Sequence, residues 1–342
     1  MRLPLERGPV STAVVGALAG GGAVDERPLL AHLDRLPEDH DTVLDDDLQL
    51  ALWTLYELHY RGFDEVDDAR EWDPDLLRLR ASLESRFEHD LRCRTRADVG
   101  AALAAAPEVF EQVETLAARV DGPSLARFVQ REATHEQFLE LMMARSLYHL
   151  KESDPTSFTL PRVDGPAKVA LAELQYDEYG GGRPDRLHAG LFAEALRGCG
   201  LDATYGAYVD LTPAHTLAVN NAMSLFGLHR RLRGASLGHL GAFEMTSSLP
   251  CRRYAQGIRR LGLPEVVADY YDEHVEADAV HEQVALRDIC GRLVADEPAL
   301  HDDVLFGAAT CLRLEEVSAT QTLSAWRAGR SALVGVELRE AM

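Results

Sequence analysis

The sequence predicts an all-α protein, and three observations support this prediction. Alanine and leucine dominate the composition while valine and isoleucine are sparse, which favours helix. Nearly every long segment repeats its apolar residues with a helical period. Four prolines stand where a helix could begin, since the fixed φ and missing N–H of proline are harmless in a first turn; they are Pro184, Pro213, Pro264 and Pro298.

Length and composition limit the class of protein. A chain of 342 residues can bury a sizeable core and could hold one large or two modest domains. No run of about 18 apolar residues occurs, which argues against a membrane span. The net charge of −21 argues against nucleic acid and anionic membranes as partners. The five cysteines are far apart and form no CxxC motif, so we expect reduced thiols in a cytoplasmic protein.

The first 120 residues predict a helical region of their own. Residues 1–27 are rich in glycine and weakly hydrophobic, and we expect them to form a flexible lead. Helices are predicted at 44–60, where acidic residues occupy the first turn, and at 74–91 and 107–119. This region of amphipathic helices could form the interface of a homodimer.

Residues 121–330 predict a seven-helix bundle. The first helix spans 124–152 and is followed by "SFTLPRV" (157–163), the one plausible strand. The other six helices are predicted at 165–179, 184–198, 213–231, 236–261, 264–295 and 298–328. We predict no particular role for the tail at 331–342.

The segment "HVEADAVH" (274–281) carries three groups that can bind a metal. Relative to His274, the helical turn places Asp278 and His281 at roughly +40° and −20°, so all three share one face. Apolar neighbours such as Tyr270 and Leu286 indicate that this face looks inward. Because an unpaired buried polar group costs on the order of 1–3 kcal/mol, the three side chains require a partner.

Three further side chains complete a candidate metal site. Glu178 and His188 lie on successive helices that the "GGGRP" turn can fold together, and Glu244 lies in a small, apolar neighbourhood. With His274, Asp278 and His281 they provide three carboxylates and three imidazoles, enough for two divalent iron ions with open positions. Such oxygen and nitrogen ligands suit iron or manganese better than a closed structural zinc site.

A competing motif is "REATH", where Glu132 and His135 form an ExxH pair. In ferritin-type bundles a single Glu precedes the first ExxH, but here the ExxH comes first, so we do not expect these two residues to bind metal. The other histidines lie near helix ends or beside arginines, so we predict surface or capping roles for them. They are His149, His215, His229, His239 and His301. Asn220 and Asn221 predict a polar contact between helices, with a substrate contact as the alternative.

Taken together, these motifs resemble the haem-oxygenase-like diiron oxidases and oxygenases, which include the iron-containing redox enzymes of actinobacteria. The resemblance covers residues 121–330 and rests on "DEYGGGRPDRLH", on Glu244 and on the final H-x3-D-x2-H. "LYELHYRGF" (55–63) also resembles the N-terminal part of these relatives, where structural use of Glu57 and His59 is expected. Some relatives recruit a further carboxylate, for which Glu152, Asp177 and Glu315 are weak candidates.

The resemblance implies a haem-oxygenase-like fold that binds two ferrous ions and uses dioxygen as co-substrate. Members of the family oxidise an amine or guanidine nitrogen, cleave a C–C bond or desaturate an aliphatic chain. The "DEYGGG…H" form favours N-oxygenation of a small nitrogenous or amino-acid-like metabolite in specialised biosynthesis, with room for an external electron donor. A haem-binding protein and a metal-storage protein are the alternatives from other classes. No catalytic residue is predicted beyond the metal ligands.

Overall fold

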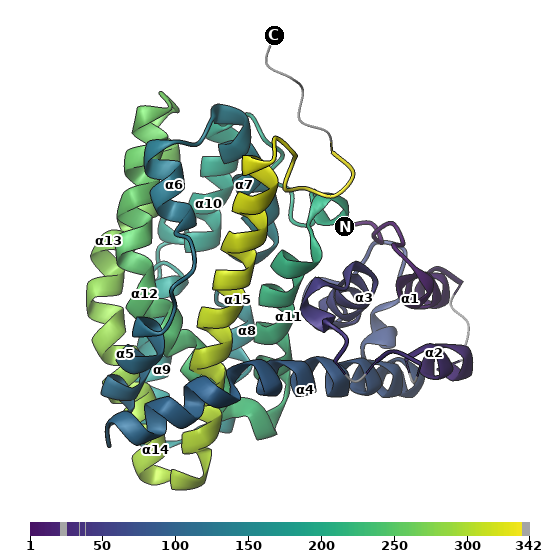
Figure 1. The fold of residues 1–342 in the computed structure, drawn as a ribbon, viewed down its shortest axis with the longest axis horizontal. Helices are drawn as coiled ribbons and strands as arrows, with labels where there is room; N and C mark the ends of the chain where they lie inside the picture. The colour runs from purple at the N-terminus through teal and green to yellow at the C-terminus, as the bar shows by residue number, and fades with distance from the viewer. Residues whose placement is uncertain (21–25, 34, 38, 337–342) are drawn as a thin grey trace.

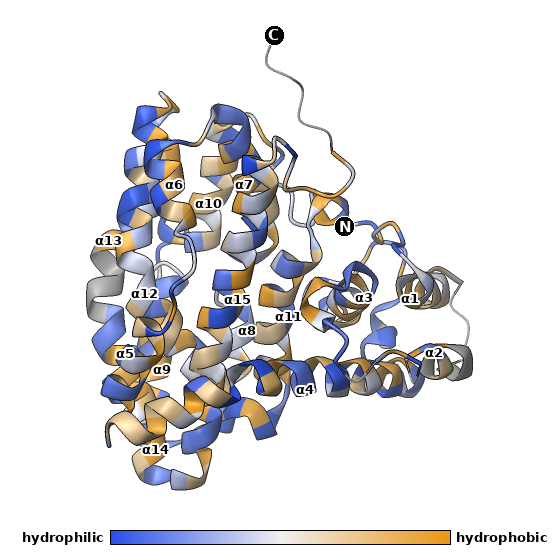
Figure 2. Cartoon of the chain, in the orientation of Figure 1, coloured by the Kyte–Doolittle hydropathy of each residue, from blue (hydrophilic) through white to orange (hydrophobic). Residues whose placement is uncertain are grey.

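The computed structural model describes residues 1–20, 26–33, 35–37 and 39–336, apart from the side chains of residues 26–28, 30 and 276–280. Every regular element in this part of the chain is a helix, so the all-α prediction is confirmed. A tall bundle forms one side of the molecule, and the N-terminal helices pack against its flank (Figure 1). Each helix carries both apolar and polar residues, as expected for helices that bury one face (Figure 2).

The N-terminal group contains α1 to α4 and two short 3-10 turns. Their bounds are α1 (Pro9–Gly20), α2 (Glu26–Leu33), η1 (Thr42–Leu44), α3 (Asp46–Glu57), η2 (Asp68–Trp72) and α4 (Pro74–Ala105). Helix α4 leads from this group to the bundle, where it packs on α15 (His301–Arg327) (Figure 1).

Helix α1 contradicts the prediction of a flexible lead for that part of residues 1–27. Val10, Val14 and Leu18 recur at a spacing of four and are buried on one face. The carboxylate of Asp47 accepts hydrogen bonds from the backbone N–H groups of Val10 and Ser11, each at 2.7 Å. This segment therefore folds here because α3 supplies both an apolar surface and an N-terminal cap for its apolar face.

The bundle is built from the remaining helices, in an order close to the prediction. Their bounds are α5 (Val109–Ala118), α6 (Leu125–Arg131), α7 (His135–His149), α8 (Asp154–Ser157), α9 (Gly165–Glu178), α10 (His188–Gly198), α11 (Ala214–Leu228), α12 (Arg233–Arg260), α13 (Glu265–Gln283), α14 (Arg292–Asp296) and α15. Short turns link them: η3 (Leu160–Arg162), η4 (Pro184–Arg186), η5 (Val209–Leu211), η6 (Arg230–Leu232), the π-helix η7 (Val284–Gly291) and η8 (Pro298–Leu300). Helix α12 packs on α6, α13 and α15 and so lies at the centre of the bundle.

Two local predictions for the bundle were wrong. The helix predicted at 124–152 is interrupted between α6 and α7, where Thr134 starts α7 with a capping box that it forms with Gln137. The strand predicted at 157–163 is instead occupied by α8 and η3. A lone strand needs a partner for its backbone groups, and here Thr159 N–H bonds to Thr156 O at 2.9 Å within a helical turn.

The hydrophobic core is continuous across residue 120. Leu50 and Trp53 of α3 share one cluster with Phe192 of α10, and Val113 of α5 shares another with Ile289. The division into regions 1–120 and 121–330 stays a prediction. None of the five cysteines, all of which lie in the described part of the chain, forms a disulfide. Among the described residues, no helix has both the length and the apolar character needed to cross a membrane.

Candidate metal centre

Two groups of histidine and glutamate side chains lie inside the bundle. The first cluster contains Glu152, His188 and His274, and the second cluster contains Glu178, Glu244 and His281. Within each cluster, one ligand atom of each residue lies within 4.8 Å of those of the others. All six residues are buried, between 4% and 7% exposed. The side chains come from the segment after α7 and from α9, α10, α12 and α13.

The turn between α9 and α10 joins Glu178 and His188. Glu178 is the last residue of α9 and His188 the first of α10. Gly180, Gly181 and Gly182 between them have φ values of 85°, 60° and 79°, a left-handed conformation that favours glycine. As a result, His188 Nδ1 lies 3.0 Å from Glu178 Oε2. The expectation that this turn folds the two residues together is met.

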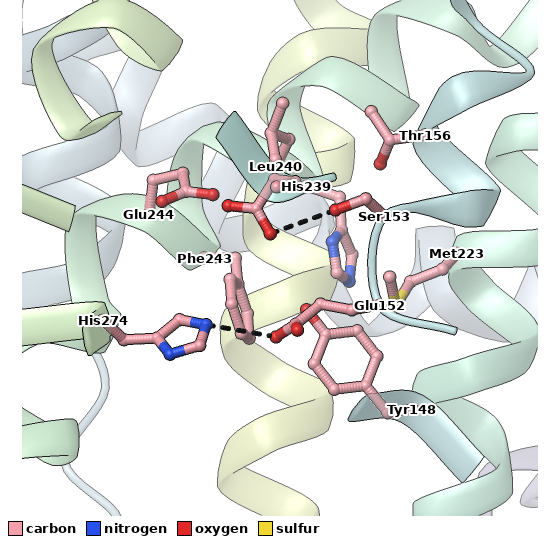
Figure 3. A pocket seen from close by; sticks show the side chains of 11 residues that line it. Tyr148, Glu152, Ser153, Thr156, Met223, His239, Leu240, Phe243, Glu244 and His274 are labelled. Atoms are coloured by element: carbon pink, nitrogen blue, oxygen red, sulfur yellow. Dashed lines mark hydrogen bonds and ion pairs between the residues drawn. The ribbon is translucent and has the colours of Figure 1, made fainter. Parts of the chain in front are cut away.

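Glu178 lies between the two clusters. Its Oε2 faces His188, while its Oε1 lies 3.6 Å from His281 Nδ1. The same His281 nitrogen lies 3.6 Å from Glu244 Oε2. Ser153 Oγ donates a hydrogen bond to Glu178 Oε2 at 3.1 Å and fixes the orientation of this carboxylate (Figure 3). One carboxylate thus presents an oxygen to each cluster.

In the first cluster, backbone hydrogen bonding sets the tautomer of His274. Its Nδ1 lies 2.8 Å from the carbonyl oxygen of Tyr270, which can only accept, so Nδ1 carries a proton. Nε2 faces Glu152 Oε1 at 3.5 Å (Figure 3). A ring N–H bonded to a backbone carbonyl is typical of metal-ligating histidines, and Nε2 is the nitrogen of His274 that would bind the metal.

Glu152 is held in place by two aromatic neighbours. Its Oε1 lies 3.3 Å from His149 Nδ1 and 3.0 Å from the Tyr270 hydroxyl, and these two groups lie 2.7 Å from each other. Burial alone would raise the pKa of Glu152, but the hydrogen bonds of His149 and His274 lower that pKa well below its usual range. The carboxylate is therefore ionised.

The electrostatic surroundings favour positive charge in the second cluster. Burial would lower the pKa of His281, but its interactions with Glu244 and Glu178 outweigh burial and raise the pKa to about 9. The pKa of His188 is raised as well, because the effect of Glu178 outweighs that of burial. The grouped carboxylates thus attract a cation at this point of the bundle.

The donor set fits metal ions. Glu152 Oε2 is buried and forms no hydrogen bond to any residue that the structure describes. Buried polar atoms in native proteins are nearly always satisfied, so such an atom points to an ion or another ligand. His188 Nδ1 and His281 Nδ1 face carboxylate oxygens of the second cluster, as metal ligands around a shared ion would. Three carboxylates and three imidazoles, without a thiolate, form a set that iron or manganese accepts.

The structure brings together five of the six residues that the sequence predicts for the site. These are Glu178, His188, Glu244, His274 and His281. The side chain of Asp278 lies outside the described residues. Glu152 enters the first cluster, although the sequence marks it only as a weak candidate. The other two weak candidates lie elsewhere: Asp177 has a 56% exposed side chain 3.5 Å from His281, and Glu315 pairs with Arg145 at 2.8 Å.

A signal for Glu152 exists in the sequence. His149 and Glu152 are three residues apart, a spacing that places both on one face of a helix, and both are buried. Helix α7 ends at His149, and the residues that follow it lead into the candidate site. An H-x2-E pair just before Pro155, the proline in the first turn of α8, would have marked Glu152 as a candidate ligand.

Three histidines for which surface or capping roles were predicted are buried instead. His149, His215 and His239 are each less than 9% exposed, because α7, α11 and α12 are covered by neighbouring helices. Burial lowers the pKa of His215 and of His239 to about 4, so both are neutral at pH 7. Glu132 and His135 are exposed at the junction of α6 and α7, outside both clusters.

A small cavity adjoins the first and second clusters. Its free volume is about 20 Å³, which is room for about one water molecule. Besides cluster residues it is lined by aromatic and apolar side chains and by His239 (Figure 3): Tyr148, Met223, Leu240 and Phe243. Asn220 and Asn221 do not line it. Asn221 instead donates to the backbone oxygen of Gln49 on α3 at 2.8 Å, which confirms the predicted contact between helices.

Comparisons with known proteins identify the family of this chain. A family model described as "Iron-containing redox enzyme" matches residues 139–316, more than half of the chain and the part that contains both clusters. The nitrosourea synthase of Streptomyces achromogenes subsp. streptozoticus is 28% identical over 145 residues, which are 42% of this chain and 31% of that relative. The alignment thus reaches less than a third of the relative's length.

A comparison with solved structures gives a weaker match. The crystal structure of a CADD-like protein of unknown function from Nostoc punctiforme PCC 73102 gives a TM-score of 0.46 at 15% identity, over 69% of this chain and 97% of that one. The family match is the stronger finding, since it covers most of the bundle and all six cluster residues. The chain belongs to the family of iron-containing redox enzymes and is an oxidoreductase.

Proposed function

We propose that this protein is a non-haem diiron oxygenase that oxidises nitrogen in a small metabolite. The observation that carries the proposal is the position of Glu178, with one oxygen 3.0 Å from His188 and the other 3.6 Å from His281. A carboxylate in that position would help to hold an ion at each cluster. The first cluster would hold one ion through Glu152, His188 and His274, and the second cluster would hold the other through Glu178, Glu244 and His281.

A ferrous pair bound there would supply the electrons and the open coordination positions that dioxygen needs. The protein's own residues prepare that site in advance. Tyr270 O keeps the proton of His274 on Nδ1, and Ser153 Oγ holds Glu178 Oε2. Tyr148 and Phe243 wall the cavity and exclude bulk water, which protects a reactive site from side reactions.

Nitrogen oxidation is supported by the name of one relative. The name nitrosourea synthase describes a product with an oxidised nitrogen, although the alignment covers only part of that protein. Conversion of N–H to N–OH uses one atom of dioxygen, and the second atom leaves as water with two electrons and two protons. We therefore propose an external two-electron donor as a partner.

The proposal is tested by isotope labelling. The protein is loaded anaerobically with Fe(II), mixed with a reductant and a panel of amines, guanidines and N-methylated amino acids, and exposed to ¹⁸O₂. We expect one ¹⁸O on nitrogen in a product that is absent with Glu178→Gln. Label on carbon, or loss of a carbon fragment, would instead indicate C–C cleavage, and a desaturated product without label would indicate dehydrogenation. Either result would replace N-oxygenation.

A further inference from the structure

A buried ion pair lies directly behind the candidate metal centre. Glu57 of α3 is 0% exposed and Lys151 is 3% exposed, and Lys151 Nζ lies 3.3 Å from Glu57 Oε2. Burying two opposite charges carries a desolvation cost that their attraction often fails to repay. A buried ion pair of this kind therefore need not increase the stability of the fold. We look for its role in fixing the conformation of the residues around it.

Several groups satisfy the remaining polar atoms of this pair. The Tyr205 hydroxyl donates to Glu57 Oε2 at 2.7 Å, and the backbone N–H of Arg61 donates to Glu57 Oε1 at 3.3 Å. The ammonium of Lys151 lies 4.0 Å from the centre of the Tyr60 ring. Both oxygens of Glu57 and the charge of Lys151 are thus held in a defined geometry.

The pair is attached to the segment that supplies the metal centre. Residues 150–153, which we call the 150–153 turn, join α7 to α8. Lys151 extends from this turn to Glu57, while Glu152 enters the first cluster and Ser153 bonds to Glu178. Arg61 adds a second anchor, since its Nη2 donates to the carbonyl oxygen of Leu150 at 2.8 Å. One face of the turn is fixed to Glu57 of α3 and to Arg61, which follows α3. The other face carries the side chains that enter or support the metal centre.

We propose that the Glu57–Lys151 pair positions Glu152 and Ser153 for metal binding, and that the N-terminal helix α3 is thereby part of the metal centre's support. The proposal rests on the proposed function, because it needs a metal at the first cluster. It assigns a role to the segment "LYELHYRGF" (55–63), which contains Glu57, Tyr60 and Arg61. Glu57 and Lys151 act through the turn and are positioning residues.

The test measures Fe(II) binding to the full chain, by anaerobic titration of the wild type and of Glu57→Gln, Lys151→Met and the double variant. His188→Ala and His281→Ala first assign each binding step to its cluster. We expect the affinity of the first cluster to fall at least tenfold in all three pair variants. The second cluster is reached by the turn only through the hydrogen bond of Ser153 to Glu178, so its affinity should fall less than threefold. The double variant leaves no unpaired buried charge. A loss of Fe(II) affinity in this variant therefore shows that the pair had positioned the 150–153 turn.

The matched control is Glu140→Gln. Glu140 is also a buried carboxylate, and its Oε2 accepts hydrogen bonds from Trp326 and from Ala332 N–H, but it lies outside both clusters. We expect this variant to lose stability in urea unfolding and to bind two irons normally. The inference is overturned if the folded double variant binds Fe(II) at the first cluster as the wild type does, or if Glu140→Gln weakens that cluster equally. A wild type that binds no iron would overturn the proposed function itself.

Discussion

At the scale of single residues, the metal centre depends on a carboxylate, Glu152, whose position is set by its surroundings. It lies after the end of α7 and is held by His149 and Tyr270 on one side and by the neighbouring Lys151 on the other. Its ionised state follows from hydrogen bonds that lower its pKa despite burial. Residues of two distant parts of the chain, 149–152 and the segment around Tyr270, therefore cooperate to present one carboxylate oxygen.

We predict that Glu152→Gln reduces the iron content from about two to about one per chain, because a neutral amide binds a cation far more weakly than a carboxylate. Iron is counted after anaerobic loading and removal of free Fe(II). Asp177→Asn is the control, because Asp177 is a largely exposed carboxylate beside His281. If Glu152→Gln retains the iron content of the wild type, Glu152 is not a ligand.

The site residues could be predicted from the sequence where the spacing between neighbouring residues determines which side chains come together. His274 and His281 share a helix face by their separation alone, and a glycine turn joins Glu178 to His188. The role of Glu152 and the burial of His239 depend instead on which helices pack around them. Such packing is decided by the whole fold, so a residue-by-residue view of the sequence placed His239 at the surface and gave Glu152 little weight.

At the scale of elements, the turn between α9 and α10 is the most demanding conformation in the site. A Cβ added at Gly180 would overlap the carbonyl oxygen of Arg183 and come within 2.8 Å of Leu187 N, in addition to the strain of φ 85°. At Gly181, the nearest atom to an added Cβ is a ring carbon of Tyr176 at 3.8 Å, an ordinary contact. The two glycines thus differ in steric demand although both have positive φ.

We predict that Gly180→Ala lowers the free energy of unfolding by about 2–4 kcal/mol and weakens Fe(II) binding at both clusters, because the turn must shift and Glu178 and His188 move apart. Gly181→Ala should cost about 1 kcal/mol and leave iron binding intact. Urea unfolding and Fe(II) titration measure the two effects. Equal effects of both substitutions would show that the turn geometry does not position the ligands.

The elements themselves were predictable where apolar periodicity and helix-start signals agree. Helices α9, α12 and α15 begin within a few residues of their predicted starts. Helix α1 was missed because the glycines in and after its sequence were given more weight than its apolar residues, and it folds on α3 with a cap supplied by Asp47. The segment 157–163 has strand-like residues but no neighbouring strand to pair with, so it forms helical turns instead.

At the scale of the whole molecule, buried neutral histidines make the fold sensitive to acid. His215 lies on α11, outside both clusters, and burial lowers its pKa from 6.5 to about 4. The unfolded chain takes up this proton near pH 6.5 and the folded chain does not. Stability contributed by the neutral form is therefore present above pH 6.5 and is lost as the pH falls toward 4.

We predict that the wild type loses about 2 kcal/mol more stability between pH 7 and pH 5 than a His215→Gln variant does. Gln cannot be protonated in this range, so the difference between the two proteins isolates the contribution of the histidine. Urea unfolding at the two pH values, with metal removed, gives the four free energies required. Equal losses in both proteins would show that His215 is not protonated preferentially in the unfolded state.

The central claim is that carboxylates and imidazoles of five helical segments form one binding site for two iron ions. Anaerobic equilibrium dialysis against Fe(II) tests it most directly. The account predicts about two irons per wild-type chain and about one in either His188→Ala or His281→Ala, since each substitution removes a ligand from a different cluster. An iron content that is below one in the wild type, or that stays the same in both variants, would contradict the account.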